Sequence, residues 1–223
     1  MKIFLFLATF IFCRTASAQE THASFTFLGF SADLKYAAME TYAEGGTEFE
    51  PPWTKFIFVD VDKNSYATNT INFKGKENET IENVRKQGRK MADQKLISFN
   101  IKSNNLGTRI PLNIEENGDT DVLVFIFNGV KYEVLLKSVE TGAILLSMYD
   151  QKKMDLTIRY KGKTQVLQRD KSVPASRGFV VDYKFKDVYI QDGRLAIIVE
   201  YSVGPGFEGV MDTYQMLVTG RLN

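Results

Sequence analysis

The side chains that could support catalysis in this sequence are few. His22 is the only histidine and Cys13 is the only cysteine. A HExxH zinc site and a three-histidine site need more histidines than the chain has, a serine triad would have to use His22, and a cysteine-histidine dyad would need Cys13, which is lost if the expected signal peptide over residues 1–18 is cleaved. His22 also lies near the start of the chain, where segments are usually loose, so it is a poor catalytic base. We therefore expect no metal ion and no cofactor, and these enzyme classes are excluded.

Carboxylate chemistry remains open, because two Asp or Glu side chains that flank a glycosidic bond are enough to hydrolyse it. The candidates in or beside expected strands are Glu40, Asp60, Asp62, Glu200, Glu208 and Asp212. Their spacing does not pair them, and charged residues are rarely buried without a partner. A carboxylate-based hydrolase acting on envelope glycans or peptides is thus the alternative to a chain without catalysis.

Residues 60–64 (DVDKN) resemble the start of a calcium-binding loop. Such a loop needs Gly at its sharp turn and a bidentate Glu at its end. Ser65 and Ile71 stand at those two positions. A strand that ends in a polar turn accounts for the same residues, so no calcium site is predicted here.

Two segments suggest a binding surface. Trp53, the only tryptophan, follows two prolines in residues 49–53 (FEPPW), and exposed aromatic rings on stiff loops stack on sugars or peptides in many binding modules. A tryptophan that covers one end of a sheet would explain the same sequence. Phe207 and Glu208 lie at the tip of a glycine-rich connection, residues 204–209, in which the glycines have a conformational role. These three residues are candidate ligand contacts.

Arg177 is the fourth candidate, because of the strand pairing we expect around it. Residues 179–191 and 194–203 should form a hairpin about a turn at 192–193 (DG). The start of the first strand then lies beside the end of the second, which brings Arg177 near Glu208. The two side chains would form either an ion pair that orders the two loops or a polar rim that a ligand completes.

The rest of the pattern predicts a mainly β protein with antiparallel sheets, arranged as a sandwich or an open barrel. The expected strands are residues 24–30, 36–42, 55–61, 121–127, 130–137, 143–148, 155–160, 164–168, 179–191, 194–203 and 210–219. One amphipathic helix is expected over residues 79–95. Its apolar face carries Ile81, Val84, Gly88, Met91 and Ala92, and its outer face carries Glu82, Arg85, Lys86 and Arg89. Gly88 on the apolar stripe indicates that the helix lies close against a sheet.

The first residues indicate export. Lys2, an apolar run over residues 3–13 and the small residues 16–18 (ASA) are typical of a cleavable signal peptide over residues 1–18, since the apolar run is too short to span a bilayer. Cleavage removes Cys13, so no disulfide is expected, and lowers the formal net charge from +1 to −1 by removing Lys2 and Arg14. We expect a secreted or periplasmic protein with no transmembrane segment after cleavage and no affinity for nucleic acid. The mature chain divides into residues 19–118, a β-meander plus helix, and residues 119–223, an antiparallel β region, within one compact unit.

Several segments of the sequence resemble one family. Residues 28–38 (LGFSADLKYAA) are similar to the G-F-S-x-D-G-K-Y-x-A-F opening of a bacterial family of predicted secreted proteins of unknown function (domain of unknown function 2259). Its further signatures resemble residues 166–170, 173–178, 193–196 and 205–209, in the same order. The sequence departs at Leu34, where the family usually has Gly, and at Phe179, where it often has Cys. The resemblance implies export and a shared fold, and it brings no catalytic residue.

The favoured hypothesis is therefore an exported β-domain without catalysis that binds a protein partner or a component of the cell envelope. The opening segment also looks like one strand pair of a propeller blade. That pattern occurs once, whereas a propeller needs at least four blades.

Overall fold

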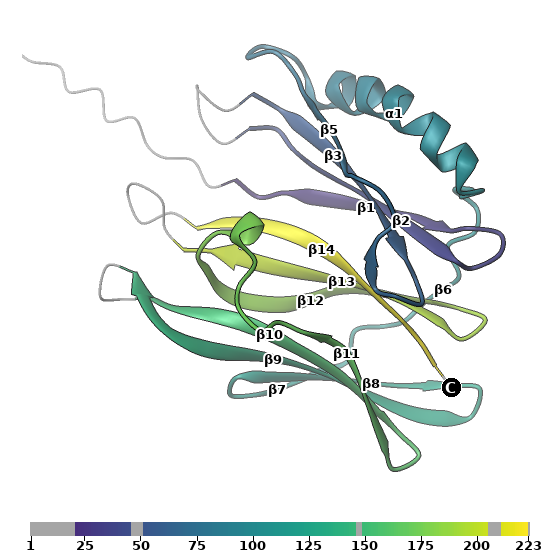
Figure 1. The fold of residues 1–223 in the computed structure, drawn as a ribbon, viewed down its shortest axis with the longest axis vertical. Coiled ribbons are helices and arrows are strands. Elements are labelled where there is room, and N and C mark those ends of the chain that lie inside the picture. The colour runs from purple at the N-terminus through teal and green to yellow at the C-terminus, as the bar shows by residue number, and fades with distance from the viewer. Residues whose placement is uncertain (1–20, 46–50, 146–148, 205–210, 223) are drawn as a thin grey trace, which may run out of the picture.

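The strand β13 (Arg194–Val203) explains how the chain is layered. Residues 195–199 (LAIIV) are all buried and do not alternate with polar residues, as expected of a strand that is covered on both faces. Ala196 and Ile198 belong to one hydrophobic core, while Leu195, Ile197 and Val199 belong to another. The computed structural model, which describes residues 21–45, 51–145, 149–204 and 211–222, accordingly places β13 in the middle of three stacked sheets (Figure 1).

All three sheets are antiparallel. The middle sheet has the order β14 (Asp212–Arg221), β13, β12 (Val180–Gln191) and β6 (Thr108–Arg109). The N-terminal sheet has the order β1 (Ser24–Phe30), β2 (Tyr36–Ala43), β3 (Trp53–Asp60) and β4 (Ser65–Tyr66), with β5 (Ile71–Lys74) also paired to β3. The C-terminal sheet has the order β11 (Lys163–Arg169), β10 (Tyr149–Tyr160), β9 (Val130–Leu145), β8 (Thr120–Phe127) and β7 (Ile114–Asn117). This open stack confirms the mainly β prediction in its sandwich form.

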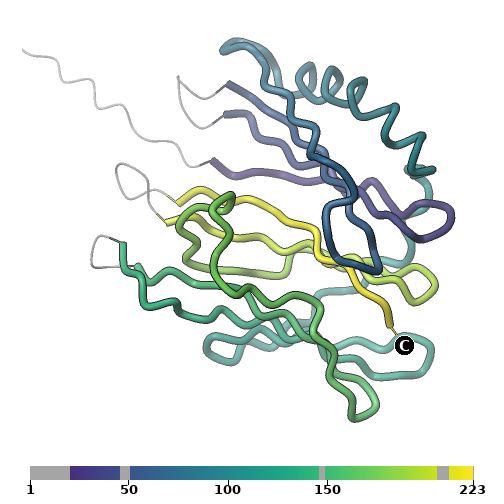
Figure 2. The backbone as a smooth tube through the Cα atoms, viewed as in Figure 1, coloured from purple at the N-terminus to yellow at the C-terminus, as the bar shows by residue number. Residues whose placement is uncertain are grey.

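The turn residues set the register of the hairpins. Asp192 has φ 45° and Gly193 has φ 74°, the left-handed pair that a two-residue turn between twisted strands requires. Gln191 therefore pairs with Arg194, and the hairpin expected there is confirmed. This turn lies at the same end of the molecule as the turn between β1 and β2 (Figure 2). Leu34 in that second turn has φ 59°, a left-handed conformation that glycine adopts most easily.

The helix α1 (Ile81–Ser98) covers the outer face of the N-terminal sheet (Figure 1). It starts two residues later than predicted because Thr80 is its N-cap and accepts a hydrogen bond from the Asn83 N–H. Met91, expected on the buried face, is 51% exposed, and Leu96 is buried in the same core as Ala92. The buried residues of the helix therefore recur at intervals of three or four positions, and Met91 falls outside this series.

Arg85 corrects a second expectation, because it does not point outward from the helix. Its Nε lies 2.9 Å from Glu40 Oε1 and its Nη2 lies 3.0 Å from Glu40 Oε2, and its guanidinium lies 3.7 Å from the centre of the Tyr42 ring. Thr54 Oγ1 donates a further hydrogen bond to Glu40 Oε1. Glu40, which is 4% exposed, is therefore held in an ion pair that fastens the helix to β2.

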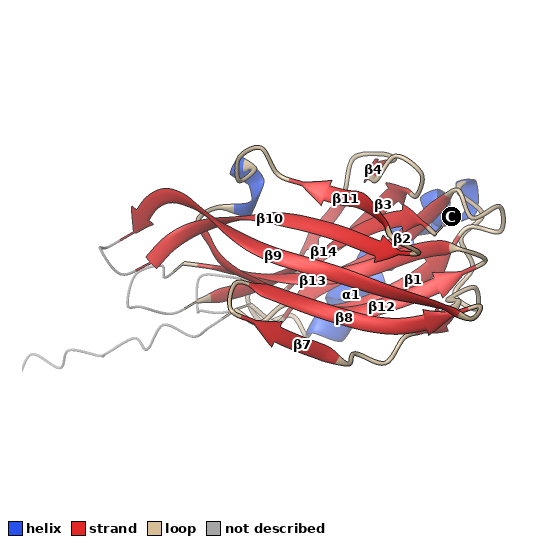
Figure 3. Cartoon of the chain, turned by 90° about the horizontal axis from the view of Figure 1, so that it is seen from below, coloured by secondary structure: helices blue, strands red, loops and turns tan. Residues whose placement is uncertain are grey.

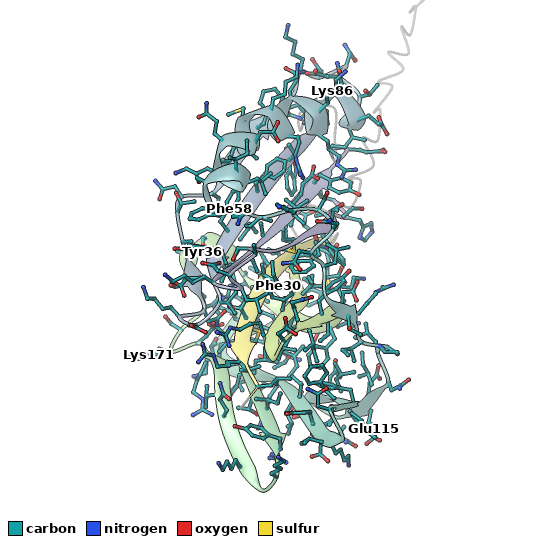
Figure 4. All side chains as sticks on the ribbon, turned by 90° about the vertical axis from the view of Figure 1, so that its right-hand side faces the viewer. Phe30, Tyr36, Phe58, Lys86, Glu115 and Lys171 are labelled. Carbon is teal, nitrogen blue, oxygen red and sulfur yellow. The ribbon has the colours of Figure 1, made fainter. Side chains whose placement is uncertain are left out.

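The side chains in Figure 4 follow the same layers. Phe58 lies between the helix and the N-terminal sheet, Phe30 lies in the next core down, and Lys86 lies on the outside of the helix. The strands that the sequence did not predict, β4 to β7, are only two to four residues long. Of the strand predicted at residues 143–148, residues 143–145 form the end of the long strand β9, and residues 146–148 lie outside the described part. Within the described residues, no helix has the length and apolar character needed to cross a bilayer.

The contact between α1 and β3 leads to a first prediction. A Cβ atom on Gly88 would lie 2.3 Å from Thr54 Cγ2, and Thr54 is buried. We expect Gly88→Ala to lower the free energy of unfolding by about 1–2 kcal/mol in a denaturant titration, since the overpacking outweighs the better helix propensity of Ala. Lys86→Ala, on the exposed face of the same helix, should change it by less than about 0.5 kcal/mol. A stabilised Gly88→Ala protein would contradict the close packing.

Candidate functional site

A cavity of about 440 Å³ lies at one side of the stack, beside β14. One wall is formed by β3 and the turn that leads to β4. The other wall includes residues 170–178, which lead from β11 through the short helix η1 (Ala175–Arg177) to β12 and which we call the strap. Figure 3 shows β11, β4 and β3 along this side of the molecule. We call the cavity the edge cleft, and its size is within the range of small-ligand pockets, about 300–1,000 Å³.

The charge of the edge cleft is positive. Lys55 and Arg177 are the only charged side chains among the described residues that line it. Lys55 extends from β3 on the same side as Ile57 and Val59, and in the described part of the chain it has no carboxylate within ion-pair distance. Burial lowers the pKa of Lys55 below its ordinary value. The edge cleft therefore presents a partly desolvated cation whose charge no described residue neutralises.

The second cation, Arg177, is paired with a carboxylate. Its Nη1 donates to Asp170 Oδ2 at 2.5 Å and to the Tyr183 hydroxyl at 3.4 Å, and both charged side chains are nearly buried. Asp170 also accepts from Gln168 Nε2 at 2.8 Å and from the Met154 N–H at 3.3 Å. This network fixes the strap against the C-terminal and middle sheets, so the wall of the edge cleft is held in place before any ligand binds.

Aromatic rings extend from the edge cleft to Trp53. Tyr201 lines the cavity, and its ring centre lies 5.8 Å from that of Tyr214 on the neighbouring strand. Tyr214 in turn lies 6.2 Å from Trp53, which is stacked on it. Burial raises the pKa of Tyr201 to about 12, so its hydroxyl stays protonated at neutral pH and can donate a hydrogen bond. Trp53 is therefore adjacent to the site without lining it.

The four residues that the sequence singled out thus have different outcomes. Arg177 lines the edge cleft, while Trp53 lies one ring beyond Tyr201. Phe207 and Glu208 lie outside the described residues, so the pairing of Arg177 with Glu208 stays a prediction. The hairpin is expected to place the start of its first strand beside the end of its second strand. The two segments do lie side by side as far as Gly204, whose N–H donates to the Phe179 carbonyl at 2.7 Å.

Sequence reasoning missed Lys55, and the reason is physical. In β3 both faces are covered, by the helix on one side and the middle sheet on the other. The apolar residues therefore do not alternate with polar ones, and nothing in the sequence shows which face a lysine takes.

The carboxylates considered for hydrolysis have local partners. Glu40 pairs with Arg85, Asp60 with Lys63, Asp62 with Arg221, Glu200 with Lys186, and Asp212 Oδ1 accepts from the Thr21 N–H. None of these five lines the edge cleft, and Glu208 lies outside the described residues. The described residues also hold no group of three His, Cys, Asp or Glu side chains arranged for a metal ion.

An acidic hollow of about 170 Å³ lies between the middle and C-terminal sheets. It is lined by Glu116, Asp119, Asp121 and Asp182 together with Lys152 and Lys184. Burial raises the pKa of Asp121, and Glu116 and Asp182 add to the shift. The hollow is smaller than typical ligand pockets and its charges are mixed, so the edge cleft is the better candidate site.

The strap network leads to a second prediction. Arg177→Ala leaves the carboxylate of Asp170 buried without its cation, which costs about 3–5 kcal/mol in comparable buried pairs. We expect a clear fall in the melting temperature with the fold retained. Arg169→Ala removes a more exposed ion pair with Asp155 and should cost less than about 1 kcal/mol. Equal effects of the two substitutions would show that the strap does not depend on Arg177.

Comparison with known proteins supports the resemblance seen in the sequence. A family model described as "Predicted secreted protein (DUF2259)" matches residues 38–221, which include every described residue of the edge cleft. Searches of curated proteins and of solved structures gave no significant match. The family description confirms the expected export. Because the match extends from β2 to the end of β14, this chain belongs to the predicted secreted protein family DUF2259.

Proposed function

We propose that the chain is an exported binding module without catalysis, and that its edge cleft holds an anionic ligand with an apolar body. The observation that carries this proposal is the position of Lys55. Holding an ammonium group partly out of water without a partner is costly. A titratable group whose pKa is shifted by burial inside a cleft is a criterion for a candidate functional site.

The other residues of the edge cleft suit the same kind of ligand. Ile57, Val59 and Leu217 provide apolar surface, while Tyr66, Tyr201 and Ser176 provide hydroxyl groups. The ligand would place its anionic group at Lys55 and its apolar body against the strands. An exported location makes a component of the cell envelope or a segment of a protein partner the expected source.

The chemistry of the edge cleft favours binding over catalysis. Its described lining holds no histidine, cysteine or carboxylate that would accept or donate a proton near neutral pH. Tyr201, with its pKa raised to about 12, is a poor base under those conditions. The hydrolase alternative would need two carboxylates about 5–9.5 Å apart in a cleft.

A third prediction concerns stability. Because burial lowers the pKa of Lys55 in the folded state, its charge opposes folding at neutral pH, and stability increases as the pH rises from the lowered pKa towards the ordinary value of 10.5. We expect Lys55→Met to raise the melting temperature at pH 7, and we expect the difference from the wild type to shrink as the pH increases. Lys63→Met, at an exposed position in the β3–β4 turn, should change little. A destabilised Lys55→Met protein at pH 7 would indicate a structural role for the ammonium group.

A fourth prediction tests ligand binding. In ¹⁵N NMR titrations we expect 4-phenylbutyrate to cause saturable shifts at residues of the edge cleft. The neutral 4-phenylbutyramide should bind about tenfold more weakly, since it lacks the charge-assisted hydrogen bond. Lys55→Met should remove the preference for the carboxylate, while Lys63→Met should keep it.

Two results would contradict the proposed function. One is that neither compound gives saturable shifts in the edge cleft. The other is that the preference for the carboxylate persists in Lys55→Met, because the anion would then be recognised elsewhere.

A further inference from the structure

The outer edge of β14 has a regular arrangement of backbone groups. On one side β14 pairs with β13 without a register shift from Asp212 to Arg221. On the other side Thr213 donates its N–H to the Thr21 carbonyl at 2.9 Å and accepts from the Ala23 N–H at 3.0 Å. Because a strand directs its backbone groups to the two sides in alternation, Thr213, Gln215, Leu217 and Thr219 all turn their N–H and C=O groups to the outer edge.

The chain itself occupies the two ends of this edge. At one end the segment that enters β1 bridges Thr213, as described above, and then turns away to pair with β2. At the other end Asn64 Oδ1 accepts from the Thr219 N–H at 2.8 Å and so replaces the carbonyl of a neighbouring strand. Asn64 is held in place because its Nδ2 donates to the Leu167 carbonyl at 2.9 Å.

Among the described residues, no strand pairs with the two positions between these ends. In the described part of the chain, the backbone N–H and C=O groups of Gln215 and Leu217 that face outward have no hydrogen-bond partner. The edge cleft lies against this stretch, since Gln215, Met216 and Leu217 all line it. Consecutive side chains of a strand point to opposite faces, so a cavity that touches all three residues must run along the edge of the strand.

We propose that the edge cleft binds a short, extended, acidic peptide segment that pairs with β14 as an added strand, with its carboxylate at Lys55. This proposal deepens the proposed function and depends on it. The segment that enters β1 already pairs with Thr213 in the same way, which shows that this edge accepts a strand. A peptide paired with Gln215 and Leu217 would extend this backbone pairing along the edge of β14 as far as Asn64.

The choice of an acidic peptide follows from the contents of the edge cleft. Backbone groups that protrude from a strand edge are satisfied most completely by another extended backbone, and this is how many proteins capture peptides. Among the described residues Lys55 has no carboxylate partner, and the described lining holds no acidic residue that would repel one. The space between the two occupied ends matches a segment of about three or four residues, since each residue of a strand spans about 3.3 Å.

The fifth prediction uses defined peptides on the full mature protein. The probe is the acetylated and amidated tetrapeptide Thr-Val-Glu-Val, and the controls are the same peptide with Gln in place of Glu and two versions N-methylated at alternate pairs of residues. We expect the probe to slow hydrogen exchange of the Gln215 and Leu217 amides in NMR, while the Tyr214 and Met216 amides, already paired with β13, stay unchanged. One N-methylated version should bind at least about tenfold more weakly than the other, because only one alternate set of amides faces β14.

The outcomes separate this inference from the proposed function. Loss of affinity with the Gln peptide and in Lys55→Met, together with exchange protection at Gln215 and Leu217, supports strand addition of an acidic peptide. Equal affinities of the two N-methylated peptides, or protection elsewhere, would overturn it. If 4-phenylbutyrate binds and the peptide does not, the peptide inference is wrong while the proposed function stands. If neither binds, both are wrong.

Discussion

The burial of the middle sheet on both faces is the constraint on which the rest of the structure depends. Each face of β13 and β14 contributes apolar side chains to a separate core, such as Ile198 and Leu217 to one and Ile197 and Val218 to the other. A chain with a single cysteine forms no internal disulfide, so its stability must come from such burial. Two cores that share one sheet bring together segments from the two halves of the sequence, because Phe27 and Met39 pack in the same core as Ile198.

The edge cleft is a consequence of this layering. The two outer sheets cover the faces of the middle sheet but leave the outer edge of β14 to be closed by loops. Asn64 contributes much of this closure. Its side chain forms hydrogen bonds with Thr219 of the middle sheet and Leu167 of the C-terminal sheet, and its backbone belongs to a turn of the N-terminal sheet. The strap closes the opposite wall through Arg177 and Asp170. Between these polar contacts the edge cleft lies against β14.

The buried and partly buried charged side chains described above are of two kinds. Glu40, Asp170 and Asp187 are buried and each is paired with an arginine, and such groups hold elements together. Lys55 is partly buried and has no such partner in the described residues, so its charge opposes folding unless a ligand neutralises it. A site that reduces the stability of the free protein and gains it back on binding is common where function and stability compete.

The sequence by itself determined the elements whose signals are local. The left-handed residues of the turn at Asp192 and Gly193 lie next to each other, and the cap at Thr80 precedes its helix directly, so hairpins, helix and fold class could be predicted. Only the tertiary structure decided which strands are covered on both faces, that Arg85 reaches Glu40 and that Lys55 enters a cleft. Those partners lie far apart in the chain, and a strand buried on both sides loses the alternation that would show where a side chain points. The contacts that make the site depend on how the sheets stack, and no local pattern of residues encodes that arrangement.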